Sequence, residues 1–209
     1  MTKKIQKAAV IGAGVMGSAI AGYLAGYGIP CELLDIPAEG DDRDKISKDA
    51  IQRLLKTKPP YLFSPKDIRR IRPGNIEDHL ERIKEADWII EAVVEKLEIK
   101  RQLFEKIESL RKEDAIVSSN TSGISLEKMA EGRSESFQKH FLITHFFNPV
   151  RYMRLLEIVK GPKTSQEVLE RIVEFGKKKL GKGIVFAKDT PNFIANRIGV
   201  YGKMLVIHE

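Results

Sequence analysis

A glycine-rich segment near the N-terminus constrains the fold of this chain more than any other feature. Gly12, Gly14 and Gly17 form the pattern G-x-G-x-x-G between an apolar run at 7–11 and a predicted helix over about 16–27. In such a strand–loop–helix unit the first glycine permits a tight turn, the second lets a pyrophosphate approach the backbone, and the third allows close packing of the helix. The alternative is a plain glycine turn. The context favours a dinucleotide-binding site.

The rest of the chain alternates between predicted strands and predicted helices. The strands are expected at 31–34, 88–94, 115–118, 141–144, 155–159 and 184–187, and the longer helices at 96–110 and 165–180. In the helix at 96–110, Ile99, Leu103 and Ile107 are spaced to face the core. This order predicts an α/β fold: a Rossmann-type, doubly wound, mostly parallel sheet with helices on both faces. Residues 37–80 are the least regular part, with a short helix expected at 49–55.

Composition narrows the possible environments and partners. Hydrophobic residues make up 42% of the chain, but the apolar runs are strand-sized, so no membrane insertion is expected. The single cysteine, Cys31, excludes an intrachain disulfide and fits a cytoplasmic protein. The net charge of +7 owes much to basic residues at 56–72, which either form a solvated surface or attract an anionic ligand such as a nucleotide or coenzyme A. No nucleic-acid motif and no metal site is expected.

An acidic residue at the end of the second predicted strand bears on the choice of cofactor. Asp35 follows the apolar run at 31–34. A carboxylate in this place can accept hydrogen bonds from the ribose hydroxyls of adenosine and repels the additional phosphate of NADP. The next residues, Ile36 and Pro37, offer no cation for that phosphate. The sequence therefore predicts NAD rather than NADP, with Asp35 as a turn residue being the alternative.

A histidine and a glutamate lie on consecutive predicted strands. His145 comes at the end of one apolar strand, and Glu157 lies within the next, at 155–159. A carboxylate among apolar neighbours is costly to bury unless it is paired, and a histidine would satisfy it. The alternatives are a structural histidine and an exposed glutamate at a sheet edge. Neither residue alone identifies an activity.

Several short motifs give the chain a resemblance to the 3-hydroxyacyl-CoA dehydrogenases. In the order in which that family has them, the motifs are Gly12 to Gly17, Glu91-Ala-Val-Val-Glu95, Ser119-Asn-Thr-Ser122, His145-Phe-Phe-Asn-Pro149 and Asp189-Thr-Pro-Asn-Phe-Ile-Ala-Asn196. The resemblance extends over nearly the whole chain except residues 37–80. It implies NAD-dependent oxidation of (S)-3-hydroxyacyl-CoA to 3-ketoacyl-CoA.

The resemblance also implies roles for individual residues. His145 resembles the general base, because imidazole titrates near neutral pH, and Glu157 resembles its orienting partner. Ser122 and Asn196 resemble polar groups that hold the substrate oxygen, with Ser122 also near the nicotinamide. The positions that match NAD contacts in the family are Glu95, Lys100, Ser122 and Asn148. For Lys100 the alternative is a solvated lysine on a helix face.

Two departures and the last residues qualify this expectation. The family commonly has glycine where Asn192 stands, and asparagine tolerates a positive φ better than most residues do. Residues 37–80 do not match the family's helical segment that helps to bind coenzyme A, so its contacts are not transferred.

The expected domains are an NAD-binding domain at 1–192 and, at 193–209, the first helix of a truncated helical domain. The family implies a homodimer for the longer protein. The alternative function is an NAD-binding fragment without turnover.

Overall fold

The computed structural model describes residues 3–207, and side chains for residues 3–206. Its sheet has eight strands in the order β3-β2-β1-β4-β5-β6-β7-β8. The strands are β1 (Ala8–Ile11), β2 (Cys31–Asp35), β3 (Ile71–Asn75), β4 (Trp88–Glu91), β5 (Ile116–Ser119), β6 (Phe141–Phe146), β7 (Leu155–Lys160) and β8 (Gly183–Ala187). All neighbours pair in parallel except β6 and β7, which are antiparallel. From β1 the chain adds β2 and then β3 on one side of β1. It then crosses back and places β4 on the other side of β1, so the strand order reverses between β1 and β4.

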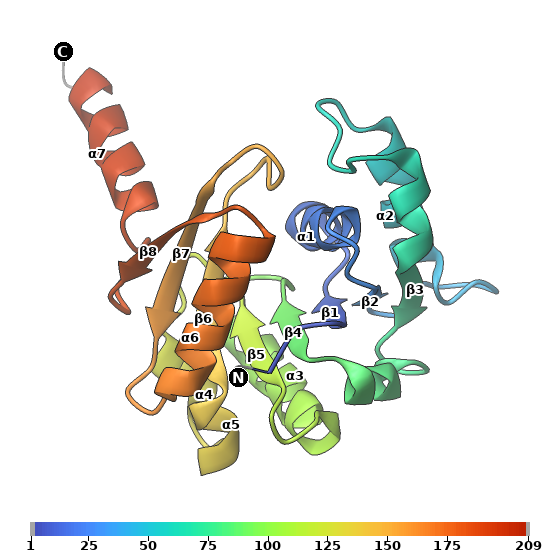
Figure 1. Ribbon diagram of the computed structural model, residues 1–209, viewed down its shortest axis with the longest axis horizontal. Helices are drawn as coiled ribbons and strands as arrows, with labels where there is room; N and C mark the ends of the chain where they lie inside the picture. The colour runs from blue at the N-terminus through green and yellow to red at the C-terminus, as the bar shows by residue number, and fades with distance from the viewer. Residues whose placement is uncertain (1–2, 208–209) are drawn as a thin grey trace.

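Helices cover both faces of this sheet (Figure 1). One layer contains α1 (Val15–Gly26), α2 (Lys45–Lys56) and α6 (Gln166–Glu174), and the other contains α3 (Leu97–Leu110), α4 (Leu126–Ala130) and α5 (Glu135–Lys139). Short 3-10 helices at η1 (Pro65–Arg70) and η2 (Leu80–Glu85) flank β3, and a π-helical turn, η3 (Phe175–Lys179), continues α6. Successive strand residues alternate between the two layers: Ala8 and Val10 join one core, while Ala9 and Ile11 join the other. The predicted fold class is confirmed.

The differences from the sequence-based expectation have local causes. Strand β3 was not predicted, because its segment Arg72-Pro73-Gly74 has low strand propensity; proline is accommodated there since β3 is an edge strand. The strand expected at 88–94 ends at Glu91, where the chain turns toward the glycine loop. Helix α2 is longer than the predicted 49–55. The inward placement of Ile99 was wrong: its side chain is exposed, and Lys100 is buried in its stead.

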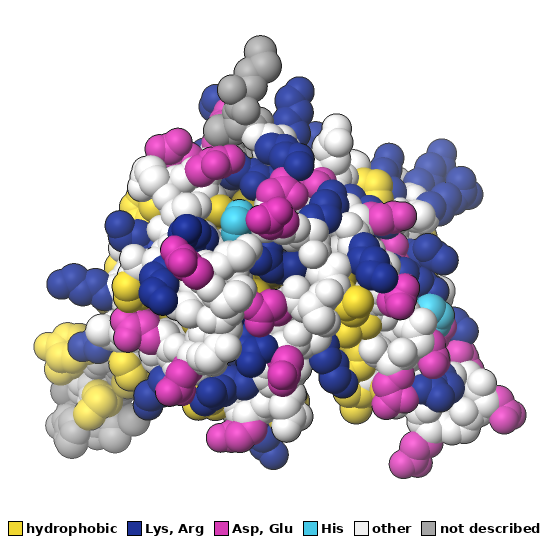
Figure 2. Space-filling view, turned by 90° about the horizontal axis from the view of Figure 1, so that it is seen from below, with side chains coloured by type: hydrophobic (Ala, Val, Ile, Leu, Met, Phe, Trp, Pro, Cys, Tyr) yellow, Lys and Arg dark blue, Asp and Glu magenta, His cyan; other side chains and the backbone are white. Residues whose placement is uncertain are grey.

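The last helix, α7 (Ala195–Ile207), projects away from the sheet beyond β8 (Figure 1). Its apolar side chains, among them Ile198, Tyr201 and Leu205, are exposed. No helix in the described part of the chain is long and apolar enough to cross a membrane. The basic side chains at 56–72 are also exposed. Figure 2 shows one face of the molecule, on which Lys and Arg side chains are interspersed with Asp and Glu side chains.

Candidate active site

The glycine loop connects β1 to α1 at the point where the strand order reverses. Gly12 has φ of +104°, and a Cβ there would lie 2.4 Å from the carbonyl oxygen of Ala92. A Cβ on Gly17 would lie 1.7 Å from the carbonyl oxygen of Gly12. A Cβ on Gly14, by contrast, would meet no heavy atom within 4 Å. Gly12 and Gly17 are thus required by packing, whereas Gly14 leaves open space in front of the α1 N-terminus, whose first N–H groups have no partner in the helix. This cradle fits a pyrophosphate.

Asp35 stands beside the glycine loop at the carboxyl end of β2. Its Oδ2 accepts a hydrogen bond from the backbone N–H of Ala13, and its Oδ1 accepts one from Ile36 at 2.7 Å. The side chain is partly exposed, so lone pairs remain available on the solvent side. Ile36 beside it is 59% exposed and offers an apolar surface. The carboxylate therefore both braces the loop and faces the place where a ribose would lie.

His145 and Glu157 form a buried pair across the antiparallel strands β6 and β7. The two residues are directly opposite in register, and His145 Nδ1 lies 2.8 Å from Glu157 Oε2. The other oxygen, Oε1, accepts from the backbone N–H groups of Ile194 at 3.1 Å and Ala195 at 2.8 Å. Because an ionised carboxylate only accepts, Nδ1 of the imidazole is the donor and Nε2 is left as the free nitrogen. Glu157 is buried, so it is not an exposed edge residue.

A cleft of about 380 Å³ lies between the glycine loop and this pair. Most of the residues predicted for the site line it, namely Glu95, Lys100, Ser122, His145, Asn148 and Asn196. The other predicted residues, Gly12, Gly14, Gly17, Asp35 and Glu157, do not line it. The first four lie at the glycine loop, and Glu157 is hydrogen-bonded to His145. The tertiary structure thus brings together groups from β6, α3, α7 and the loops that follow β4 and β5. A reacting oxygen in the cleft would have imidazole, hydroxyl and carboxamide groups around it.

Lys100 lies in a buried charge network rather than on a solvated helix face. Its Nζ is 2.6 Å from Glu91 Oε1 and 3.2 Å from Glu95 Oε2. Burial raises the pKa of Glu91, against the opposing charge of Lys100. Burial also acts to raise the pKa of Glu95, but a hydrogen bond from Thr121 and the charge of Lys100 outweigh it and the pKa is lowered. Ser122 N–H also donates to Glu95, at 3.2 Å. The network ties α3 to the loop that carries Ser122.

Several residues in the cleft or in contact with it were not predicted from the sequence. Asn120 Oδ1 accepts from the backbone N–H of Phe146 at 2.9 Å, which joins β5 to β6 beside His145. The Phe147 ring is 4.4 Å from the His145 ring. Tyr61, from the irregular segment 37–80, donates its hydroxyl to Asn148 Oδ1 at 2.6 Å. The motifs around 120 and 147 could have indicated the first two. No local signal marked Tyr61.

The turn before α7 explains the unusual asparagine. Asn192 has φ of 65°, and its N–H donates to the carbonyl oxygen of Ser122 at 3.1 Å. This is the left-handed region that favours glycine and that asparagine tolerates. Phe193 follows with φ of 44° and is buried with its ring 5.5 Å from that of His145. The turn therefore keeps its geometry without glycine and packs an aromatic ring against the imidazole.

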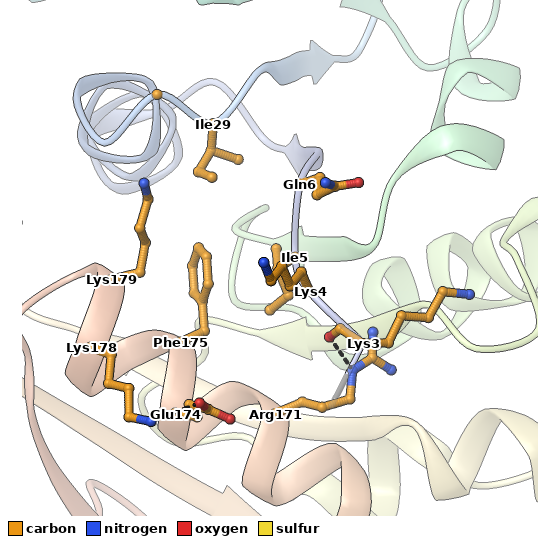
Figure 3. Close-up of a pocket in the computed structure, with 11 residues that line it drawn as sticks. Lys3, Lys4, Ile5, Gln6, Ile29, Arg171, Glu174, Phe175, Lys178 and Lys179 are labelled. Carbon is orange, nitrogen blue, oxygen red and sulfur yellow. Dashed lines mark hydrogen bonds and ion pairs between the residues drawn. The ribbon is translucent and has the colours of Figure 1, made fainter. Parts of the chain in front are cut away.

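A larger hollow of about 540 Å³ lies at the amino ends of β1 and β2, at the opposite end of the strands from the cleft (Figure 3). It is lined by residues that precede β1 and β2 and by the end of α6. Among its cations, Lys3 pairs with Asp114, Lys178 pairs with Glu174, and Arg171 donates to backbone carbonyl oxygens. In parallel α/β sheets, ligands bind at the carboxyl ends of the strands. The cleft beside His145, and not this hollow, has that location.

Comparison with known proteins identifies the family of this chain. Residues 7–190 match the family model described as "3-hydroxyacyl-CoA dehydrogenase, NAD binding domain". A probable 3-hydroxyacyl-CoA dehydrogenase of Bacillus subtilis is 52% identical over the whole chain, which covers 28% of that relative. A probable 3-hydroxyacyl-CoA dehydrogenase of Deinococcus radiodurans is 50% identical over 95% of the chain, which covers 58% of that relative. The chain therefore spans about a quarter to just over half of these proteins.

Solved structures share the fold over most of the chain. The M. tuberculosis protein FadB2 superposes with a TM-score of 0.84 at 28% identity, covering 99% of this chain and 72% of that one. A 3-hydroxybutyryl-CoA dehydrogenase of Escherichia coli gives a TM-score of 0.80 at 31% identity, covering 94% of this chain and 41% of that one. Because the family model matches residues 7–190, most of the chain, this chain belongs to the NAD-binding domain family of the 3-hydroxyacyl-CoA dehydrogenases.

Proposed function

We propose that this domain serves the NAD-dependent oxidation of (S)-3-hydroxyacyl-CoA to 3-ketoacyl-CoA. The observation that carries the proposal is His145, which lines a cleft beside the glycine cradle and is hydrogen-bonded to the buried Glu157. The cleft also contains Ser122 and Asn196, which can donate hydrogen bonds to a substrate oxygen. NAD, when bound, supplies the hydride acceptor. The groups proposed to hold it are the glycine loop with the α1 N-terminus and five side chains. They are Gly12, Gly14, Gly17, Asp35, Glu95, Lys100, Ser122 and Asn148.

In the proposed mechanism the residues of this chain handle the proton and the orientation. His145 Nε2 accepts the hydroxyl proton while the C3–H electron pair leaves as hydride and the C3 carbonyl forms. Glu157 keeps the proton on Nδ1 and stabilises the imidazolium that results. Ser122 and Asn196 hold the oxygen in place. In the reverse direction His145 returns the proton to the 3-keto oxygen.

The test is NADH consumption with acetoacetyl-CoA, with NADPH as the comparison. We expect NADH to be consumed and NADPH to react far more slowly, because the carboxylate of Asp35 repels the additional phosphate. His145→Ala should abolish turnover while NADH affinity, measured by its fluorescence, stays within about threefold, because proton transfer and cofactor binding use different groups. Normal turnover in that variant would remove His145 from the mechanism.

A second candidate is an NAD-binding fragment without turnover. It is favoured by the fact that the chain covers 28% and 58% of two of its relatives. NADH binding without consumption of either cofactor would support it, and the same assay on a longer polypeptide would then decide the activity.

We also propose that residues 1–192 form the NAD-binding domain and that 193–209 begin a second, helical domain. The support is the exposed apolar surface of α7, which needs a covering partner. In the longer protein we propose a homodimer with an acyl-CoA substrate, and a cytoplasmic location. Sedimentation of the longer polypeptide would test the dimer.

A further inference from the structure

The loop at 147–154, between β6 and β7, forms one wall of the cleft. It carries Phe147 and Asn148, both of which line the cleft, and it connects β6, the strand of His145, to β7, the strand of Glu157. Most of this loop is exposed or only partly buried. A shift of the loop would therefore displace the Phe147 ring, which lies 4.4 Å from the imidazole ring, and the Asn148 carboxamide in the cleft.

Lys182, directly before β8, holds this loop from inside the molecule. Its residue exposure is 5%, and its Nζ donates to the carbonyl oxygens of Val150 at 2.5 Å and Met153 at 2.7 Å. The same nitrogen lies 4.2 Å from the ring centroid of Tyr23 and 5.7 Å from that of Phe146. The carbonyl groups and ring faces thus surround the ammonium group on several sides. The contact joins the loop to α1, β6 and the start of β8.

The opposite side of the loop is anchored to the irregular segment 57–64. Arg151 Nη1 donates to the carbonyl oxygen of Leu62 at 2.6 Å, and its guanidinium carbon lies 4.5 Å from the centroid of the Phe63 ring. Tyr61 fixes the Asn148 carboxamide, as described above. Lys182 is the member of this arrangement that contacts the loop backbone from the core side.

The charge of Lys182 is held by neutral groups. Within the described residues no carboxylate forms an ion pair with it, and desolvation by burial lowers its pKa to about 8. Tyr23 of α1 faces it, and burial raises the pKa of that phenol. Arg151 of the loop is directed toward 60–63, and Lys177, Lys178 and Lys179 of η3 are exposed. A buried lysine without a carboxylate partner is rare in folded proteins.

We propose that Lys182 is a positioning residue for the candidate active site, and that its side chain holds the loop 147–154 so that Phe147 and Asn148 stand beside His145. Its effects on turnover and on NADH affinity rest on the proposed function; its effect on the loop does not. The proposal makes the geometry of the cleft depend on a residue that does not line it.

The first experiment compares Lys182→Met with Lys179→Met, an exposed lysine of η3, by hydrogen exchange at neutral pH. Methionine keeps the apolar stem between the rings but cannot donate to the loop carbonyls. We expect amides of 147–154 to exchange about tenfold faster in Lys182→Met, with the central strands unchanged, and no change in Lys179→Met. NADH affinity, measured by fluorescence, should weaken about fivefold in Lys182→Met alone, since Asn148 is displaced.

Unchanged exchange in 147–154 overturns the proposal. So does faster exchange with unchanged NADH affinity in Lys182→Met, when Asn148→Ala is found to weaken that affinity. Neither readout requires turnover, so failure of the proposed reaction would not be mistaken for failure of this inference. If Lys182→Met does not fold, the same two measurements on Lys182→Gln decide, because its shorter neutral side chain removes the ammonium but keeps a polar group at the site. Exchange in 147–154 that is unchanged in Lys182→Gln overturns the proposal.

Discussion

At the residue scale, the conformation of a few side chains and peptides sets the chemistry of the cleft. Glu157 is the clearest case, since one oxygen orients His145 and the other receives the backbone N–H groups that lead into α7. The sequence placed His145 and Glu157 on consecutive strands but could not give their register. The antiparallel pairing of β6 and β7 decides it, because a slip of one residue would turn one of them to the other face.

Glu157→Gln is predicted to lower turnover by about 10³-fold or more while NADH affinity is retained. If the amide oxygen keeps accepting from Ile194 and Ala195, the amide NH₂ faces His145 Nδ1. The imidazole then protonates on Nε2, and the free base is lost. Steady-state kinetics on a polypeptide with turnover is the measurement, with Glu135→Gln, at an exposed helix position, as the matched control. Turnover within a factor of two of wild type would contradict this role.

At the element scale, the strand–loop–helix unit of β1 and α1 was predicted almost completely, because glycine spacing and apolar runs are local signals. Charged residues on helices were less predictable. Lys100 is on the buried side of α3 because Glu91 at the end of β4 supplies a carboxylate there, which the helical periodicity does not reveal. Strand β3 forms through pairing with β2, although its own sequence disfavours a strand.

The glycine loop predicts opposite outcomes for two glycine-to-alanine changes. Gly14→Ala should leave the free energy of unfolding within about 0.5 kcal/mol, because its Cβ meets only open space, yet weaken NADH binding at least tenfold. Gly17→Ala should destabilise the fold by about 1–3 kcal/mol, since its Cβ collides with the Gly12 carbonyl. Urea unfolding and NADH fluorescence titration measure the two effects. Equal loss of stability in both variants would show that the open cradle is misassigned.

At the scale of the whole molecule, the sheet and its two helical layers form the core, and α7 extends beyond it. Phe193 is the last residue of the described chain in the buried hydrophobic core. The apolar side chains of α7 that follow are exposed. The boundary between the core and α7 therefore falls within a turn, at residues with positive φ.

This boundary predicts different costs for substitutions on its two sides. Phe193→Ala should lower the free energy of unfolding by about 3–5 kcal/mol, because it empties a buried site beside His145. The double change Ile198→Ser and Leu205→Ser should alter it by less than about 1 kcal/mol, since both side chains are exposed, and should reduce self-association. Urea unfolding and analytical ultracentrifugation check these values. A large loss of stability in the double variant would mean that α7 packs on the core.

The sequence by itself determined the fold class, the nucleotide cradle and the motifs of the site, because these follow from residue spacing and local conformational preference. The tertiary structure decided which groups meet. It set the register that joins His145 to Glu157, the burial of Lys100, and the contacts of Tyr61 and Lys182 with the loop 147–154. Each of these links residues that are distant in sequence or lie on different strands. Such contacts depend on packing and strand pairing across the whole sheet, which no local pattern encodes.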